Sequence, residues 1–131
     1  MKIAVDTNVL LRTIVDDDEE QAARAVMLLD TADMAAVSLQ TLCELVWVLR
    51  SAYKVDRPDI AAAIRSILNT RNVVANRPAA EAGLDLLEAG GDFADGVIAW
   101  DGKWLGGDMF CSFDRKAVSL LTRQGHHATL L

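Results

Sequence analysis

Short runs of β-branched and small apolar residues alternate with helical segments along this chain, and this alternation constrains the fold more than any other feature. We predict strands at residues 3–5, 34–37, 73–75, 109–113 and 128–131. We predict helices at residues 9–15, 22–29, 38–52, 78–89, 94–105 and 116–122, and a further helix that begins near Pro58. Strands joined by helices pair in parallel, with helices on both faces of the sheet. The pattern therefore predicts a single three-layer α/β domain over residues 1–131, with a parallel sheet of about four to five short strands.

The composition excludes several classes of protein. Of the 131 residues, 52% are apolar and the net charge is −6, which excludes an intrinsically disordered chain. The longest apolar runs have five residues, too few to span a bilayer. Asp6 interrupts the first apolar stretch, so no signal peptide fits there. Cys43 and Cys111 lie in apolar segments typical of free core thiols, and we therefore expect a cytoplasmic protein that does not bind membranes.

Charge is divided between two blocks of the sequence. Residues 50–77 carry six basic and two acidic groups, net +4, whereas residues 78–114 carry eight acidic groups and one basic group, net −7. For any single residue, an ordinary solvated helix face is the plainer interpretation. As blocks, they indicate a basic surface for a polyanion beside an acidic site that works with metal cations. The candidates for phosphate contacts are Arg12, Arg50, Lys54, Arg57, Arg65 and Arg115.

Three carboxylates stand where a site would form. Asp6 and Asp114 follow predicted strands, and ligands of open α/β sheets bind outside the carboxyl ends of the strands. Each could instead cap the helix that follows it. Glu44 is the only charged residue of the segment LCELVWVL, which we predict to be largely buried. A buried carboxylate needs a partner, either a basic side chain or a metal ion shared with other acids.

A pair of aspartates opens the predicted helix at residues 94–105. Asp92 and Asp95 share a face at this spacing. Asp92 follows two glycines and is a natural N-cap, whereas Asp95 is free to point toward the strand ends. We therefore expect Asp95 to join Asp6, Glu44 and Asp114 in one site, with Asp92 in a supporting role. Oxygen ligands without a Cys/His cluster favour Mg²⁺ or Mn²⁺ over Zn²⁺, and such ions activate water against phosphodiesters.

Four segments carry these acids in a particular order: DTNVLLR at residues 6–12, SLQTLCELVWVL at 38–49, GDFADGVIA at 91–99 and SFDRKA at 112–117. Together they resemble the PIN-domain ribonucleases, and their order, spacing and total length fit the VapC toxins of toxin–antitoxin pairs. The resemblance covers nearly the whole chain. It implies an Mg²⁺- or Mn²⁺-dependent endoribonuclease whose metal is held by Asp6, Glu44, Asp95 and Asp114.

The resemblance also implies supporting residues and partners. Asn8 would lie near the site, and Ser112 would orient a carboxylate. The substrate would be RNA, a cognate antitoxin would hold the enzyme inactive, and the toxin would usually be a homodimer. Many relatives have an acidic residue or Asn where this chain has Lys116, which leaves open whether one or two metals act.

An antitoxin could inhibit by inserting an Arg or Lys side chain among the four carboxylates. We expect Leu10, Leu11 and Trp47 to form the groove for its apolar anchor residues.

Two other classes stay open: a catalytically silent PIN-like module and a receiver-like signalling domain. A receiver domain needs a phospho-acceptor aspartate after a central strand, where this chain has Asn76.

Overall fold

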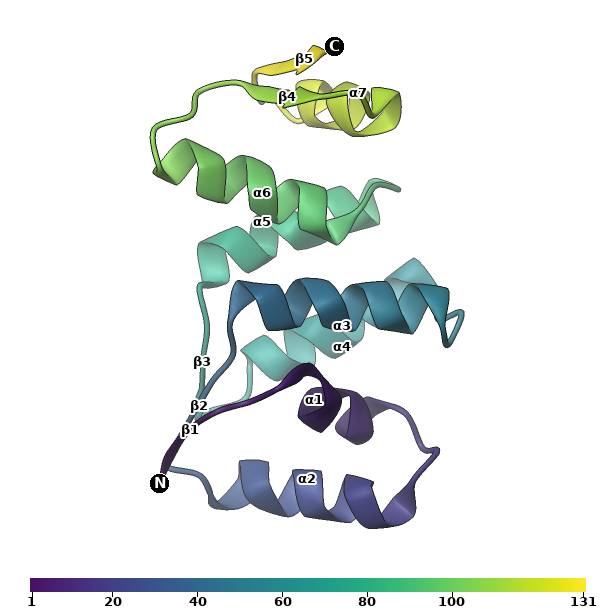
Figure 1. Cartoon of the computed structure of the whole chain (residues 1–131), viewed down its shortest axis with the longest axis vertical. Coiled ribbons are helices and arrows are strands. Elements are labelled where there is room, and N and C mark those ends of the chain that lie inside the picture. The colour runs from purple at the N-terminus through teal and green to yellow at the C-terminus, as the bar shows by residue number, and fades with distance from the viewer. The chain divides into compact units, whose positions relative to one another are not determined.

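The computed structural model describes all residues, 1–131, and contains seven helices and five short strands (Figure 1). Every strand pair is parallel, which confirms the predicted α/β class. The contacts divide the chain into two compact units, Met1–Asn76 and Arg77–Leu131, and each is described by itself. A single domain over the whole chain stays a prediction. None of the seven helices has the length and apolar character needed to cross a membrane.

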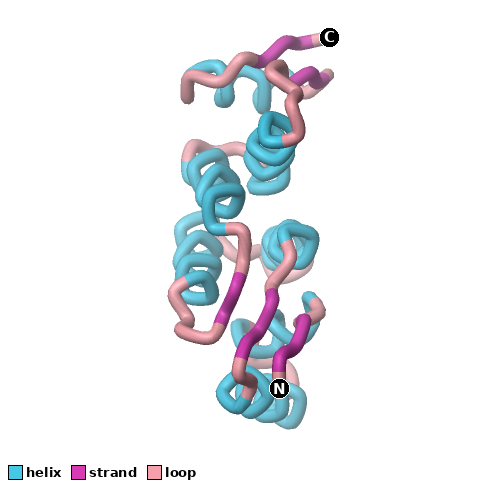
Figure 2. The backbone as a smooth tube through the Cα atoms, turned by 90° about the vertical axis from the view of Figure 1, so that its left-hand side faces the viewer, coloured by secondary structure: helices cyan, strands magenta, loops and turns pink.

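The first unit contains a three-stranded parallel sheet with four helices. Strands β1 (Lys2–Ala4), β2 (Met34–Ala36) and β3 (Val73–Val74) lie side by side in that order (Figure 2). The register places Ile3 opposite Ala35, and Ala35 opposite Val73. The helices α1 (Thr7–Ile14) and α2 (Glu19–Thr31) connect β1 to β2, and α3 (Leu39–Ser51) and α4 (Arg57–Leu68) connect β2 to β3. Each predicted strand and helix of this unit is confirmed to within a few residues.

Capping side chains set the helix starts of the first unit. Asp18 accepts a hydrogen bond from the backbone N–H of Gln21 at 3.0 Å and begins α2. Glu19 and Glu20 lie in the first turn of α2, where their negative charges interact favourably with the helix dipole. Ser38 begins α3 by accepting from the N–H of Thr41 at 3.1 Å. These caps satisfy N–H groups that have no partner within the helix.

The core of the first unit uses one face of α3, not the whole helix. Leu42, Leu45 and Leu49 are fully buried, whereas Trp47 is 69% exposed and Glu44 is also exposed. At 100° per residue, the leucines fall on one face and the other two residues on the opposite face. The prediction that LCELVWVL is largely buried therefore holds for the face with the leucines and is wrong for Glu44 and Trp47.

The second unit contains α5 (Arg77–Glu88), α6 (Phe93–Trp104), β4 (Phe110–Ser112), α7 (Arg115–Arg123) and β5 (Ala128–Leu130). Strands β4 and β5 form a parallel pair with Phe110 opposite Ala128. Glycine lets α5 and α6 approach closely, because a Cβ at Gly96 would lie 2.4 Å from the carbonyl oxygen of Ala82. Both cysteines are free, as predicted, but Cys111 on β4 is exposed and is not a core thiol.

Candidate metal centre

The acids of the first unit are connected through a threonine. Asp6 follows β1 and is the N-cap of α1, where its Oδ1 accepts from the backbone N–H of Thr7 at 2.8 Å. The Thr7 side chain is buried, and its hydroxyl donates to Oε2 of Glu44 at 2.7 Å. The start of α1 and the second turn of α3 are therefore joined, and Glu44 lies next to the residue that follows Asp6.

The partner of Glu44 differs from the one expected. Glu44 is exposed, so the argument that burial forces this carboxylate to find a cation is wrong. A hydroxyl donor holds one of its oxygens, which leaves the other oxygen accessible to solvent or to a ligand. Burial, followed by the charge of Glu44, raises the pKa of the neighbouring Cys43 thiol to about 11, so this cysteine stays protonated near neutral pH.

The second unit brings three carboxylates together. Asp92, Asp95 and Asp114 each place one oxygen within 4.8 Å of the other two. Asp95 is half-buried, whereas the other two are exposed. Partial burial, followed by the charges of Asp92 and Asp114, raises the pKa of Asp95 above its ordinary value. A divalent cation would relieve this repulsion, and three hard oxygen donors are the ligand type that Mg²⁺ and Mn²⁺ prefer.

Local structure explains why these three aspartates can face one another. Asp92 stands at the N-cap position of α6 but makes no capping hydrogen bond through its side chain, so that alternative is wrong, and its supporting role beside Asp95 stays a prediction. Asp95 lies in the first turn of α6. Asp114 is the N-cap of α7 and accepts from the N–H of Ala117 at 3.1 Å, and Ser112 Oγ accepts from the N–H of Asp114 at 2.9 Å. Asp114 therefore both caps a helix and belongs to the acidic group.

The model of the PIN domain family matches residues 3–119 of the chain. The chain belongs to the PIN domain family. PIN domains are generally nucleases, and they generally use a divalent metal. No curated protein matches the chain. The family separates this PIN domain from receiver domains and supports the predicted three-layer α/β fold.

The four predicted ligands are divided between the two units of this PIN domain. Asp6 and Glu44 lie in the first unit, and Asp95 and Asp114 in the second. Within the first unit Asp6 and Glu44 are linked by Thr7, and within the second unit Asp95 and Asp114 are neighbours. The convergence of all four stays a prediction.

The sequence patterns did not indicate a role for Thr7, and they indicated only a supporting role for Asp92. Thr7 follows Asp6 directly in the segment DTNVLLR, and a hydroxyl at the first position of a helix could have been recognised as a donor to a nearby acid. The sequence predicts a cap or a supporting role for Asp92, because N-cap preference alone does not tell whether the side chain makes the capping hydrogen bond. Asn8 is exposed on the first turn of α1, one residue beyond Thr7.

The basic residues predicted to contact phosphate differ in whether they already have a protein partner. Arg12 forms an ion pair with Asp17 at 2.5 Å, and the Tyr53 hydroxyl donates to the same carboxylate at 2.8 Å. These two contacts hold the pKa of Asp17 below its ordinary value. Asp17 therefore occupies one N–H group of Arg12 and partly neutralises its charge, which weakens its attraction for a phosphate.

The other basic candidates fall into two groups. Arg57 and Arg65 are half-buried and have partners of their own, and Arg50 is also half-buried. Lys54 and Arg115 are exposed. Lys54 follows α3 in a left-handed conformation, with φ of 55°, and Arg115 is the first residue of α7 beside Asp114. Phosphate contacts by these residues stay a prediction.

Proposed function

We propose that this PIN domain is an endoribonuclease that depends on Mg²⁺ or Mn²⁺. The observation that carries the proposal is the convergence of Asp92, Asp95 and Asp114 within 4.8 Å. Partial burial, and then the charges of Asp92 and Asp114, raise the pKa of Asp95, which is the direction expected for a half-buried carboxylate beside like charges. Three oxygen donors with no histidine or cysteine among them fit a hard divalent cation.

The proposed ligands are Asp6, Glu44, Asp95 and Asp114. Asp92 belongs to the same acidic group and would supply a further oxygen. Thr7 acts as a positioning residue, because its buried hydroxyl limits the directions in which the Glu44 carboxylate can point. Ser112 has the same kind of role, since it fixes the backbone from which Asp114 extends.

The chemistry divides between the ion and the chain. When bound, the divalent ion would activate water for attack on an RNA phosphate and offset charge on the leaving 3′ oxygen. Asp92, Asp95 and Asp114 each place one oxygen within 4.8 Å of the other two, and carboxylate oxygens accept hydrogen bonds from water. Arg115, exposed beside Asp114, is placed to attract the phosphate backbone toward the acids.

We further propose that the protein is the toxin of a toxin–antitoxin pair, that it acts as a homodimer in the cytoplasm, and that an antitoxin inhibits it. A group of carboxylates is a receptor for a guanidinium side chain, which supports inhibition by an inserted Arg or Lys. The expected groove needs revision, because Leu10 and Leu11 are buried in the core of the first unit and cannot contact a partner. Trp47 is exposed and stays available to one.

Cleavage of a structured RNA by the purified protein tests the enzymatic proposal. Mg²⁺ or Mn²⁺ should support cleavage, and EDTA should abolish it. We expect Asp95→Asn to lower the rate by at least about a hundredfold, because the loss of one directly coordinating group strongly weakens metal binding. We expect the same of Asp6→Asn, Glu44→Gln and Asp114→Asn. Asp108→Asn, an exposed aspartate of the second unit outside the acidic group, is the matched control and should cleave normally.

Two results would contradict the enzymatic proposal. One is cleavage that survives EDTA. The other is a set of variants that fold, bind RNA and cleave at the wild-type rate.

Growth measurements test the toxin proposal. Expression of the wild-type chain should arrest growth, and Asp95→Asn should not. Co-expression of the product of a neighbouring short reading frame should restore growth. Arrest by both forms would place the toxicity outside the acidic site.

A further inference from the structure

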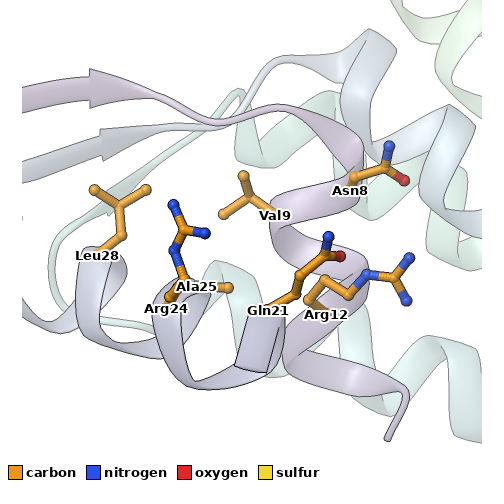
Figure 3. Close-up of a pocket in the computed structure, with 7 residues that line it drawn as sticks. All are labelled: Asn8, Val9, Arg12, Gln21, Arg24, Ala25 and Leu28. Atoms are coloured by element: carbon orange, nitrogen blue, oxygen red, sulfur yellow. The ribbon is translucent and has the colours of Figure 1, made fainter. Parts of the chain in front are cut away.

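A cleft between α1 and α2 lies outside the acidic groups and has no role in the proposed chemistry. Its volume is about 490 Å³, within the range of about 300–1,000 Å³ typical of sites for small ligands. Val9 of α1 and Ala25 and Leu28 of α2 form its apolar surface. The polar residues that line it are Asn8, Arg12, Gln21 and Arg24 (Figure 3).

The two arginines of the cleft are not equivalent. Arg12 is paired with Asp17, and Figure 3 shows its guanidinium directed away from Arg24. Arg24 is exposed and takes part in no ion pair. In Figure 3 it extends from α2 toward the cleft, with Leu28 on one side and Val9 on the other. A planar cation is thus presented beside aliphatic side chains without a protein anion to satisfy it.

The cleft adjoins the acids of the first unit. Asn8 lines it and stands two residues after Asp6, so their Cα atoms are at most about 7.6 Å apart. Thr7, the residue between them, holds Glu44. The backbone of Asp6 therefore lies close to the end of the cleft that Asn8 lines, although Asp6 itself is not among the lining residues.

We propose that this cleft binds one unpaired nucleotide of the RNA substrate, with its base stacked on the Arg24 guanidinium. RNA is read mainly through unpaired bases that stack on aromatic rings or guanidinium planes and hydrogen-bond through their edges. The amide of Gln21 offers both donors and an acceptor for a base edge, and Asn8 offers the same at the end of the cleft nearest Asp6. The unit as a whole has a net charge of −3, but the Arg24 guanidinium has no ion-pair partner and attracts a phosphate locally.

This inference rests on the proposed ribonuclease function and deepens it. The cleft would select a substrate with an unpaired nucleotide, such as one in an RNA loop, and place a neighbouring phosphate beside Asp6. An apolar segment of a protein partner is the competing occupant. The unpaired guanidinium and the two amides favour the nucleotide.

Binding of ten-nucleotide single-stranded RNAs, one for each base, tests the inference. The dissociation constant is measured by fluorescence anisotropy in Ca²⁺, and kcat and KM for the same oligonucleotides are measured in Mg²⁺. Arg24→Ala should weaken binding about tenfold, equal to about 1.4 kcal/mol, as expected for one stacked base. Arg24→Lys keeps the positive charge but removes the planar guanidinium on which a base can stack. Its affinity should therefore exceed that of Arg24→Ala by less than half of the loss in log Kd that Arg24→Ala causes. Gln21→Leu should reduce the differences between the four RNAs.

Arg71→Ala is the matched control, because Arg71 is an exposed arginine of the same unit outside the cleft. It should change binding by less than about twofold. Equal effects of Arg24→Ala and Arg71→Ala, or full recovery by Arg24→Lys, would overturn the stacking inference while leaving the nuclease proposal intact. A wild-type protein that neither binds nor cleaves any RNA would overturn both.

Discussion

Replacing Asp95 by asparagine removes the central charge of the acidic group in the second unit. We expect this change to stabilise the protein without metal and to abolish its stabilisation by metal. Asparagine has nearly the same shape as aspartate, so the substitution isolates the charge.

The structure sets the size of the stabilisation. At 4.8 Å two unit charges repel by about 0.9 kcal/mol at the dielectric constant of water and by about 3.5 kcal/mol at an effective value of about 20. Asp95 has two such neighbours, but Asp92 and Asp114 are exposed, so solvent screening keeps each repulsion near the lower figure. The variant should gain about 1–2 kcal/mol in the free energy of unfolding, or about 4–8 °C in the melting temperature for a chain of this size.

The pH dependence follows from the direction of the pKa shift. Partial burial and then the two neighbouring charges raise the pKa of Asp95 in the folded state. A raised carboxyl pKa costs no stability below the ordinary aspartate value of about 3.9, and costs its full amount above the raised value. The difference in stability between the variant and the wild type should therefore be near zero at about pH 3 and complete at pH 7.

Thermal unfolding in EDTA, followed by titration with Mg²⁺, measures both effects. A ligand at a hundred times its dissociation constant adds about 2.7 kcal/mol to the wild type, whereas the variant should gain much less. The order of the two melting temperatures should therefore reverse as Mg²⁺ is added. Asp108→Asn is the control for the change in net charge. Equal melting temperatures for wild type and Asp95→Asn at pH 7, or an equal gain in Asp108→Asn, would refute the reasoning.

Two further predictions concern a positioning contact and a helix contact. Thr7→Val removes the hydroxyl that donates to Glu44, so we expect kcat/KM for RNA to fall about tenfold and the free energy of unfolding to fall by about 1 kcal/mol. Cleavage kinetics and urea unfolding measure the two effects. An unchanged kcat/KM would show that this contact is only structural. Gly96→Ala would place a Cβ 2.4 Å from a backbone oxygen of α5 and should destabilise the second unit by about 1–3 kcal/mol, measured by thermal unfolding. In the control, Gly102→Ala on the same helix, the new Cβ meets no atom within 4 Å, so this variant should have equal or higher stability.

The sequence by itself determined the elements and most of their boundaries. The order of strands and helices, and the start of α3 at Ser38, follow from apolar periodicity and capping preferences, whereas α2 begins three residues before the predicted residue 22. These depend on residues within one or two turns of each other, so a linear pattern contains them. The same pattern placed Asp6 and Asp114 at strand ends.

Only the tertiary structure decided the partners and the exposure of the site residues. The Glu44 carboxylate accepts a hydrogen bond from the hydroxyl of Thr7, 37 positions away in the sequence. Glu44 is exposed despite its apolar neighbours in the sequence, because the helix places it on the face opposite the buried leucines. Asp92 occupies an N-cap position, yet its side chain makes no hydrogen bond to the helix end and lies beside Asp95 and Asp114. The cleft beside Arg24 exists because two helices pack side by side. Distances between side chains from different elements depend on how those elements pack, and no local preference along the chain specifies them.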